Sequence, residues 1–303
     1  MEENSQFRDV FNRESVTALA NRIACVYPTF ETENFIESIL VDFEGLTLSE
    51  RNLKICRALK SFLPDDFTEA VAVLLESQTE ELEVDKMEGS RGFIVMPQTF
   101  FISENGMNYF ELSMHALEEM TKRFTSEFAI RYFLIEYPEK TLNQMKKWAL
   151  DTNCHVRRLA SEGSRPRLPW SMRLNNFIQD PAPVIEILEL MKFSKERLVE
   201  RSIANNLNDI AKDNPDAVCG LLLKWQKEGV SDWLINHSLR TLFKQGNPQA
   251  LKLCGFDPDA KITLTDFTLN SLEIEFGKTL EFSFNRSEER RVGKECRSRW
   301  SRD

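Results

Sequence analysis

The sequence is poor in the residues that build metal, redox and nucleotide sites. Among 303 residues there are six cysteines and three histidines. No two cysteines form a CxxC pair, and His115, His155 and His237 are isolated from one another, which argues against a zinc site. A glycine-rich phosphate loop is also missing. We therefore expect no metal, nucleotide or redox cofactor, and free thiols at the cysteines.

Long apolar runs are missing as well. No stretch approaches the ~18 apolar residues of a membrane-spanning helix. The polar and acidic residues 1–5 lack the features of a secretory signal. Apolar residues nevertheless make up 42% of the chain, which is enough for a substantial core. These features predict a cytoplasmic protein with one large domain or two smaller ones.

The charge is acidic in sum but uneven along the chain. The formal net charge is −9, which at first argues against a nucleic-acid partner. Between residues 140 and 173, however, only Asp151 and Glu162 are acidic, against eight basic residues: Lys140, Lys146, Lys147, Arg157, Arg158, Arg165, Arg167 and Arg173. A basic face on an acidic body is typical of a DNA-binding groove whose back is solvated.

The first 250 residues predict helix after helix. Apolar residues recur at the three-and-four spacing of amphipathic helices over 35–41 and 53–59, and a further helix follows over 67–75. The glycines of 88–92 predict a loop.

From about residue 110 the helical pattern repeats loosely. Similar segments recur at roughly the period of two-helix HEAT-type units: 127–131, 156–162, 199–206 and 237–243. Pro138, Pro181, Pro215 and Pro248 mark the turns between them. Stacking such units buries their apolar faces and gives a curved solenoid. We predict an all-α, HEAT-like domain over 1–256 with a concave basic face; an irregular helical bundle is the alternative.

The pattern changes after residue 256. Alternating apolar residues predict strands over 261–269, 272–276 and 280–284, with a turn at Gly277-Lys278. Two or three strands do not form a stable sheet alone, so 257–285 is interpreted as the start of a truncated β-sandwich. The arginine-rich segment 286–303 breaks the alternation and is interpreted as a non-native tail; the alternative is a basic nucleic-acid-binding tail.

The segment 154–170 holds the most unusual combination of side chains. It carries four arginines, Glu162 and Trp170 within seventeen residues. Arginine and glutamate are rarely buried unpaired, so this mixture is poor core material. It suits a surface that binds phosphates and holds a carboxylate and an aromatic ring near a polyanion. Trp148, on an apolar helical stripe, is instead expected in the core.

Simpler explanations exist for each of the other candidate residues. Glu127 precedes Arg131 by four residues, the spacing of a surface ion pair. Asp209 belongs to a polar cluster with Asn205, Asn206 and Asn208 that would suit helix capping as well as a ligand. Trp170 could pack between repeats. Glu162 at a helix C-terminus opposes the helix dipole, which favours a functional reason for it.

Three segments, 126–131, 155–170 and 201–216, carry a resemblance to a known family. Their sequences are SEFAIR, HVRRLASEGSRPRLPW and RSIANNLNDIAKDNPD. The chain over roughly residues 1–285 resembles the AlkC-type bacterial DNA alkylation-repair glycosylases, relatives of the AlkD-type enzymes built from HEAT-like repeats. The resemblance implies that 257–285 is a partial immunoglobulin-like domain.

The resemblance also implies the site. It places Glu127, Glu162, Trp170 and Asp209 in a lesion pocket, with Arg131 joining Trp170 in substrate binding. The basic surface for DNA would consist of Arg157, Arg158, Arg165, Arg167, Lys146 and Lys147. Carboxylates suit hydrolysis of an N-glycosidic bond to a cationic base, because they stabilise the sugar cation and position a water. Glu162 is the first choice for that water, with Glu127 and Asp209 in support.

We therefore expect a monofunctional alkylpurine DNA glycosylase of the bacterial cytosol that removes bases such as 3-methyladenine. Its partner would be double-stranded DNA containing alkylated bases, without membrane contact, and the protein would act as a monomer. The alternative is a non-catalytic HEAT-repeat scaffold that binds protein or nucleic acid, because fold does not imply function.

Overall fold

The chain folds into two units that differ in their secondary structure. A computed structural model describes residues 7–86, 90–259 and 262–288. The units are Met1–Gln245, built of helices, and Gly246–Asp303, which holds a short helix and a two-stranded antiparallel sheet. This architecture confirms the predicted fold class, a helical-repeat solenoid followed by a short β segment.

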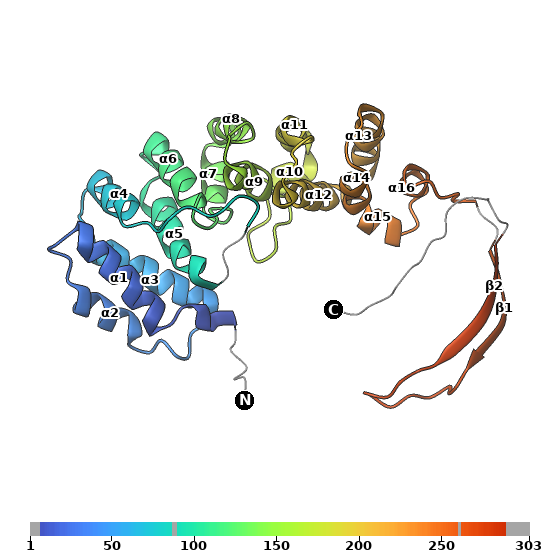
Figure 1. The fold of residues 1–303 in the computed structure, drawn as a ribbon, viewed down its shortest axis with the longest axis horizontal. Coiled ribbons are helices and arrows are strands. Elements are labelled where there is room, and N and C mark those ends of the chain that lie inside the picture. Colours follow the sequence, from blue (N-terminus) through green and yellow to red (C-terminus); the bar gives the residue numbers. More distant parts are fainter. Residues whose placement is uncertain (1–6, 87–89, 260–261, 289–303) are drawn as a thin grey trace. The chain divides into compact units, whose positions relative to one another are not determined.

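The helices of the first unit follow one another with short connections (Figure 1). They are η1 Phe7–Val10, α1 Arg13–Val26, α2 Thr32–Leu40, α3 Leu48–Phe62, α4 Phe67–Glu76, η2 Ser90–Val95, α5 Met96–Asn105, α6 Phe110–Thr121, α7 Ile130–Glu136, α8 Pro138–Trp148, α9 Cys154–Gly163, α10 Asn175–Gln179, α11 Ala182–Met191, α12 Arg197–Ala211, α13 Pro215–Glu228, α14 Asp232–Ser238 and α15 Arg240–Lys244.

The helices predicted over 35–41, 53–59 and 67–75 lie in α2, α3 and α4, apart from Val41, which caps α2. The predicted loop at 88–92 is wrong from Ser90 onward, where η2 begins; residues 88 and 89 lie outside the described residues.

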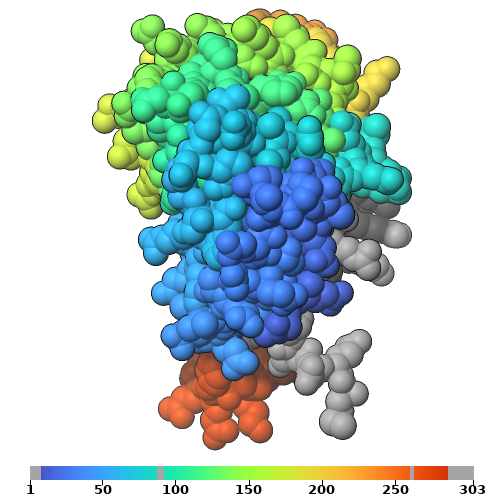
Figure 2. Space-filling model, turned by 90° about the vertical axis from the view of Figure 1, so that its left-hand side faces the viewer, coloured from blue at the N-terminus to red at the C-terminus, as the bar shows by residue number. Residues whose placement is uncertain are grey.

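From α6 onward the helices stand in two rows. Figure 1 shows α6, α8, α11 and α13 in the upper row and α9, α12 and α14 in the lower one. Within the lower row α9 packs against α12, and α12 packs against α14. Each pair therefore buries its apolar face against the next pair, as in a HEAT-like solenoid. Figure 2 looks onto the N-terminal end of the stack, formed by the blue helices.

Prolines and polar caps define where these helices begin. Pro138, Pro215 and Pro248 each occupy the first turn of a helix, where the missing N–H is not needed. Asn153 accepts a hydrogen bond from His155 N and caps α9. The prolines that mark the turns in the sequence therefore act as helix starts.

The end of α9 packs closely against α7 and α8. A Cβ atom at Gly163 would lie 2.6 Å from Ile130 Cγ2 and 3.1 Å from Met145 Cε. Only glycine leaves room for this approach, which brings the C-terminal turn of α9, and Glu162 with it, against the helices before it. By contrast, Gly220 in α13 has open space around it.

Gly163→Ala is expected to destabilise the protein by about 1–3 kcal/mol, because the new methyl group forces α9 away from Ile130. The matched control, Gly220→Ala, should be neutral or stabilising by up to ~1 kcal/mol, since alanine favours an open helical position. Urea unfolding followed by circular dichroism measures both. Equal effects of the two changes would show that the packing at Gly163 is not tight.

The segment 77–86, here called the strap, connects helices of the first unit that are far apart in the sequence. Figure 1 shows it in cyan, leaving α4 and running to α9. Leu82 N donates to Lys122 O at 2.8 Å, and His155 Nε2 donates to Glu83 O at 3.0 Å. Asp85 then accepts a 2.6 Å hydrogen bond from Leu198 N, in the first turn of α12. The strap thus fixes the spacing of α6, α9 and α12.

The histidine that holds the strap favours its neutral form. Burial lowers the pKa of His155, and the carbonyl of Glu83 only partly opposes this. Its Nδ1 atom is buried without a hydrogen-bond partner among the described residues, so protonation there leaves an unpaired donor.

The stability contributed by His155 is therefore expected to depend on pH. The folded pKa lies below the unfolded value of about 6.5, so the unfolded chain gains the proton first as pH falls. The contribution of His155 to the free energy of unfolding is complete above the pKa of the unfolded chain. It is lost as the pH falls toward the pKa of the folded protein. His155→Gln retains a donor for Glu83 but does not titrate.

Urea unfolding of both proteins at a series of pH values tests this. The advantage of the wild type over His155→Gln should shrink between neutral and mildly acidic pH. A difference in unfolding free energy that stays constant with pH would contradict the assignment.

The second unit contains α16 Pro248–Leu253, β1 Ile262–Leu269 and β2 Phe282–Glu288. The strands pair antiparallel, with an irregularity between Thr265 and Thr268. Gly277 has φ +87°, the left-handed conformation that the predicted turn requires.

The strand predicted over 272–276 is wrong. This segment is not paired with either strand, and Leu272 is 93% exposed. The alternation of its residues is real, but a strand also needs a neighbour that accepts its hydrogen bonds, and the pattern cannot supply one. The predicted non-native tail begins at residue 286, whereas β2 continues to Glu288; residues 289–303 lie outside the described residues.

Candidate active site

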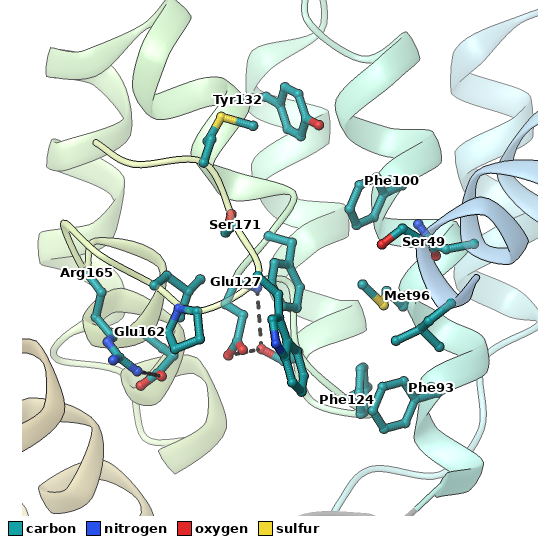
Figure 3. A pocket seen from close by; sticks show the side chains of 18 of the residues that line it. Ser49, Phe93, Met96, Phe100, Phe124, Glu127, Tyr132, Glu162, Arg165 and Ser171 are labelled. Carbon is teal, nitrogen blue, oxygen red and sulfur yellow. Dashed lines mark hydrogen bonds and ion pairs between the residues drawn. The ribbon is translucent and has the colours of Figure 1, made fainter. Parts of the chain in front are cut away.

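A cavity of about 850 Å³ lies where α3, η2, α5, the end of α9 and the loop 164–174 meet. Figure 3 shows its two unlike sides. Phe93, Met96, Phe100 and Phe124 form an apolar and aromatic wall. Glu127, Glu162 and Arg165 lie opposite, with Arg158 and Trp170 also among the lining residues. The cavity therefore presents buried charge to one side of a ligand and aromatic surface to the other.

Glu127 is held by two neighbours in the turn before α7. Thr125 Oγ1 donates to its Oε2 atom at 2.9 Å, and Arg158 Nη1 lies 2.8 Å from the same oxygen. The surface ion pair with Arg131 that the sequence spacing suggested is not formed. Glu127 is instead a buried carboxylate neutralised from α9.

Glu162, in the last turn of α9, is 6% exposed and has partners from two directions. Arg165 Nη1 lies 2.5 Å from Oε1, and Ser202 Oγ donates to Oε2 at 2.6 Å. Burial raises the pKa of Glu162, but Arg158, Arg165 and Ser202 outweigh it and hold the pKa below its usual range. The carboxylate is therefore ionised at neutral pH, and the arginines offset its unfavourable position at the helix C-terminus.

Asp209 joins the cluster through Arg165. Its Oδ2 atom accepts from Arg165 Nε at 2.8 Å, and Lys212 Nζ lies 2.9 Å from Oδ1. Arg165 thus bridges Glu162 on α9 and Asp209 on α12. The polar cluster around Asp209 lies within α12 and bonds to its neighbours: Asn206 Nδ2 donates to Ser161 O of α9 at 2.7 Å. The capping explanation holds for Asn208, whose Oδ1 accepts from Thr241 N in the first turn of α15 at 3.1 Å.

Trp170 lies at the cavity in an uncommon conformation. Its side chain is 84% exposed and its φ is +61°. An exposed indole excludes packing between repeats as its role. A bulky residue in the left-handed region costs about 1–3 kcal/mol and persists only where the surrounding structure holds it, and such residues cluster at ligand-binding sites.

Arg131 is the residue that holds this loop. Its side chain is fully buried, and Nη1 donates to Gly163 O at 3.0 Å and to Arg165 O at 2.7 Å. Nε donates to Met172 O at 3.1 Å. Burial lowers the pKa of Arg131 to about 10, still well above neutral pH. The prediction that Arg131 binds substrate conflicts with this geometry, because its donors already bond to carbonyls of the loop.

The remaining predicted DNA-binding residues lie away from the cavity, and three of the four are paired with carboxylates. Arg157 Nη2 lies 2.7 Å from Glu196. Arg167 forms two 2.7 Å hydrogen bonds with Asp213. Lys146 pairs with Glu186 at 2.6 Å, and Lys147 is exposed on α8. The structure brings Arg158 and Arg165 to the cavity but not these four.

Sequence reasoning missed the apolar wall and the role of Arg158. Arg158 Nη2 is 4.0 Å from Glu162, four residues further along α9, so Arg158 faces both cavity carboxylates. The helical spacing of Arg158 and Glu162 was a usable signal for that contact. Ser202 and the aromatic wall come from distant segments, and no local pattern marks them.

The described residues contain neither a membrane-spanning helix nor a metal-binding group of side chains. None of the helices combines the length and apolar character that crossing a membrane requires. Within the same ranges, no group of His, Cys, Asp and Glu side chains is arranged to hold a metal ion.

Stacked helix pairs with paired carboxylates, guanidiniums and an exposed indole at one cavity define a helical-repeat protein of the HEAT type. No protein-family model matches the chain. Its fold matches the alkylpurine DNA glycosylase AlkC of Pseudomonas fluorescens, solved bound to DNA containing an abasic site analog. The TM-score is 0.77 at 32% identity, covering 94% of this chain and 76% of that one.

The chain also has a relative in Bacillus subtilis. The chain is 37% identical over 282 residues to the uncharacterized protein YhaZ of Bacillus subtilis (strain 168), covering 92% of this chain and 76% of YhaZ. On these similarities the chain belongs to the AlkC family.

Arg131→Lys is expected to loosen the loop 164–174. Lysine cannot reach all the carbonyls that the guanidinium bonds, and each buried carbonyl left unpaired costs about 1–3 kcal/mol. Hydrogen exchange should become faster in this loop, and the free energy of unfolding should fall. Arg57→Lys, at an exposed position on α3, is the control. Unchanged exchange in the loop would contradict the role of Arg131.

Proposed function

We propose that this protein is a monofunctional DNA glycosylase that hydrolyses the N-glycosidic bond of cationic alkylated purines such as 3-methyladenine. The observation that carries the proposal is the pair of buried carboxylates, Glu127 and Glu162, in one cavity of a chain from the AlkC family. Burying two carboxylates requires compensating arginines and brings no advantage to a plain scaffold.

The chemistry requires little acid catalysis. A purine alkylated on a ring nitrogen carries positive charge and is already a good leaving group. As the bond to the base breaks, positive charge develops on the sugar, and a fixed anion stabilises it. At a separation of about 4 Å and an effective dielectric of ~20, two unit charges interact by about 4 kcal/mol. Realised in the transition state, this corresponds to roughly a thousandfold in rate.

Glu162 is the residue we assign to this role, and to orienting the water that attacks the sugar. Ser202 and Arg165 fix its side chain and keep it ionised, while one carboxylate face remains toward the cavity. Glu127 adds a second negative charge, and Asp209 positions Arg165. Such preorganised charge acts without rearrangement during the reaction.

Trp170 would contact the cationic base or sugar. Its exposed indole at the cavity offers a π face, and a cation over such a face gains about 0.5–2 kcal/mol. The fixed backbone around it presents the ring before DNA arrives.

The proposed partner is double-stranded DNA with alkylated bases, bound by a monomer in the bacterial cytosol. The Pseudomonas relative was solved on DNA containing an abasic site analog, which resembles the product of such a reaction.

Glu162→Gln tests the proposal. Incubation of the purified protein with methylated duplex DNA should release free 3-methyladenine, detected by chromatography. Replacing the carboxylate with the amide should lower the single-turnover rate by roughly a thousandfold. Glu111→Gln, at an exposed position on α6, is the matched control and should retain the wild-type rate.

Two outcomes would contradict the proposal. Tight binding of methylated DNA by the wild type without release of any base would indicate a non-catalytic scaffold. Equal rates for Glu162→Gln and Glu111→Gln would show that the cavity carboxylate takes no part.

A further inference from the structure

The arginines of the segment 154–170 have little capacity left for phosphate. Arg157, Arg158, Arg165 and Arg167 each have a carboxylate oxygen within 2.8 Å. The negative charge of that carboxylate offsets the charge of the guanidinium and weakens its attraction for a phosphate. Positive charge that is less neutralised lies in another part of the described chain.

The helices beyond the cavity carry a second group of basic side chains. Arg197 and Arg201 lie one turn apart on α12, followed on the same side by Asn205. Arg240, at the start of α15, donates through Nη2 to Asn205 Oδ1 at 2.9 Å. We call Arg197, Arg201, His237 and Arg240 the basic strip.

The charge of the strip is only partly neutralised. Arg197 pairs with Glu200 at 2.6 Å. Within the described ranges, Arg240 donates only to neutral oxygens, of Asn205 and of the His237 backbone. Arg201 is exposed and has no hydrogen-bond or ion-pair partner among the described residues. Burial first, and then Arg240, Arg197 and Arg201, lower the pKa of His237, so these arginines act together on one site.

Stacked rings hold part of the strip rigid. The rings of Trp233 and His237 are 4.6 Å apart and nearly parallel, at 16°. Arg197 Cζ lies 3.1 Å from the centroid of the Trp233 ring. A guanidinium held on an aromatic face loses less side-chain entropy when it binds an anion.

The strip adjoins the candidate active site through α12. One side of that helix contributes Ser202 to Glu162 and Asp209 to Arg165. Asp209 and Arg165 also affect the pKa of Arg240, which places Arg240 within electrostatic reach of the cluster. A strand passing the cavity would therefore meet the strip next.

We propose that the basic strip binds the phosphate backbone of the DNA strand that passes the cavity. The inference rests on the proposed function to the extent that DNA is the substrate. Phosphate contacts of this kind fix the register of the protein on the duplex and carry no sequence preference.

The test uses unmodified duplex DNA, so that it does not depend on base release. Affinity is measured by fluorescence anisotropy over a series of salt concentrations for the wild type, Arg201→Ala and Lys227→Ala. Lys227 is an exposed lysine on α13, in the upper row, and its replacement by alanine removes the same amount of charge. Circular dichroism checks that both variants fold.

Arg201→Ala should weaken binding for every sequence tested and reduce the slope of log affinity against log salt by about 0.9, the value for one phosphate contact. Lys227→Ala should leave the slope unchanged. An unchanged slope for Arg201→Ala, equal changes in both variants, or no binding by the wild type would overturn the inference.

The two proposals fail separately. A reduced slope for Arg201→Ala in a protein that releases no methylated base supports the basic strip and contradicts the glycosylase. Base release with an unchanged slope contradicts the strip alone.

Discussion

The site depends on the neutralisation of buried carboxylates. Glu162 and Asp209 come from the separate helices α9 and α12, and Arg165 bonds both. An isolated carboxylate in such a position would take up a proton and lose its charge. Arg165 and Arg158 keep the charge in place and join the end of α9 to its neighbours. Negative charge at the cavity and the packing of α9 against α12 therefore depend on the same contacts.

The structure separates the arginines that stabilise buried groups from those whose charge is not neutralised, although the sequence suggests one basic segment for both. The arginines near the cavity stabilise carboxylates, and Arg131 stabilises the loop that carries Trp170. Uncompensated charge lies further along α12 and α15, at Arg201 and Arg240. In the two proposals, chemistry and binding of a polyanion fall to neighbouring helices of the solenoid, and α12 contributes to both through adjacent faces.

The sequence predicted the helical repeats well, because amphipathic spacing and prolines are local signals. The resemblance to a family, not the spacing, predicted one pocket for Glu127, Glu162, Trp170 and Asp209. The first three line the cavity, whereas Asp209 is not among its lining residues and contacts the site through Arg165. The sequence could not show the partners of the arginines: Asp209 and Asp213 are more than 40 residues from the arginines they bond. The carbonyl contacts of Arg131 could not be foreseen either, because no local pattern distinguishes an arginine that binds carbonyls from one that binds a ligand. The roles of the site residues remain predictions.

The strap has a consequence for how the family can change in length. Its hydrogen bonds to Lys122, His155 and Leu198 all come from the four residues 82–85, so they fix how many helix pairs fit between α6 and α12. An additional pair inserted there would exceed the reach of an extended segment of that size, which is at most about 3.6 Å per residue. The strap sets no such limit after α12, so the helices that it joins are expected to evolve as one module and the C-terminal repeats as another.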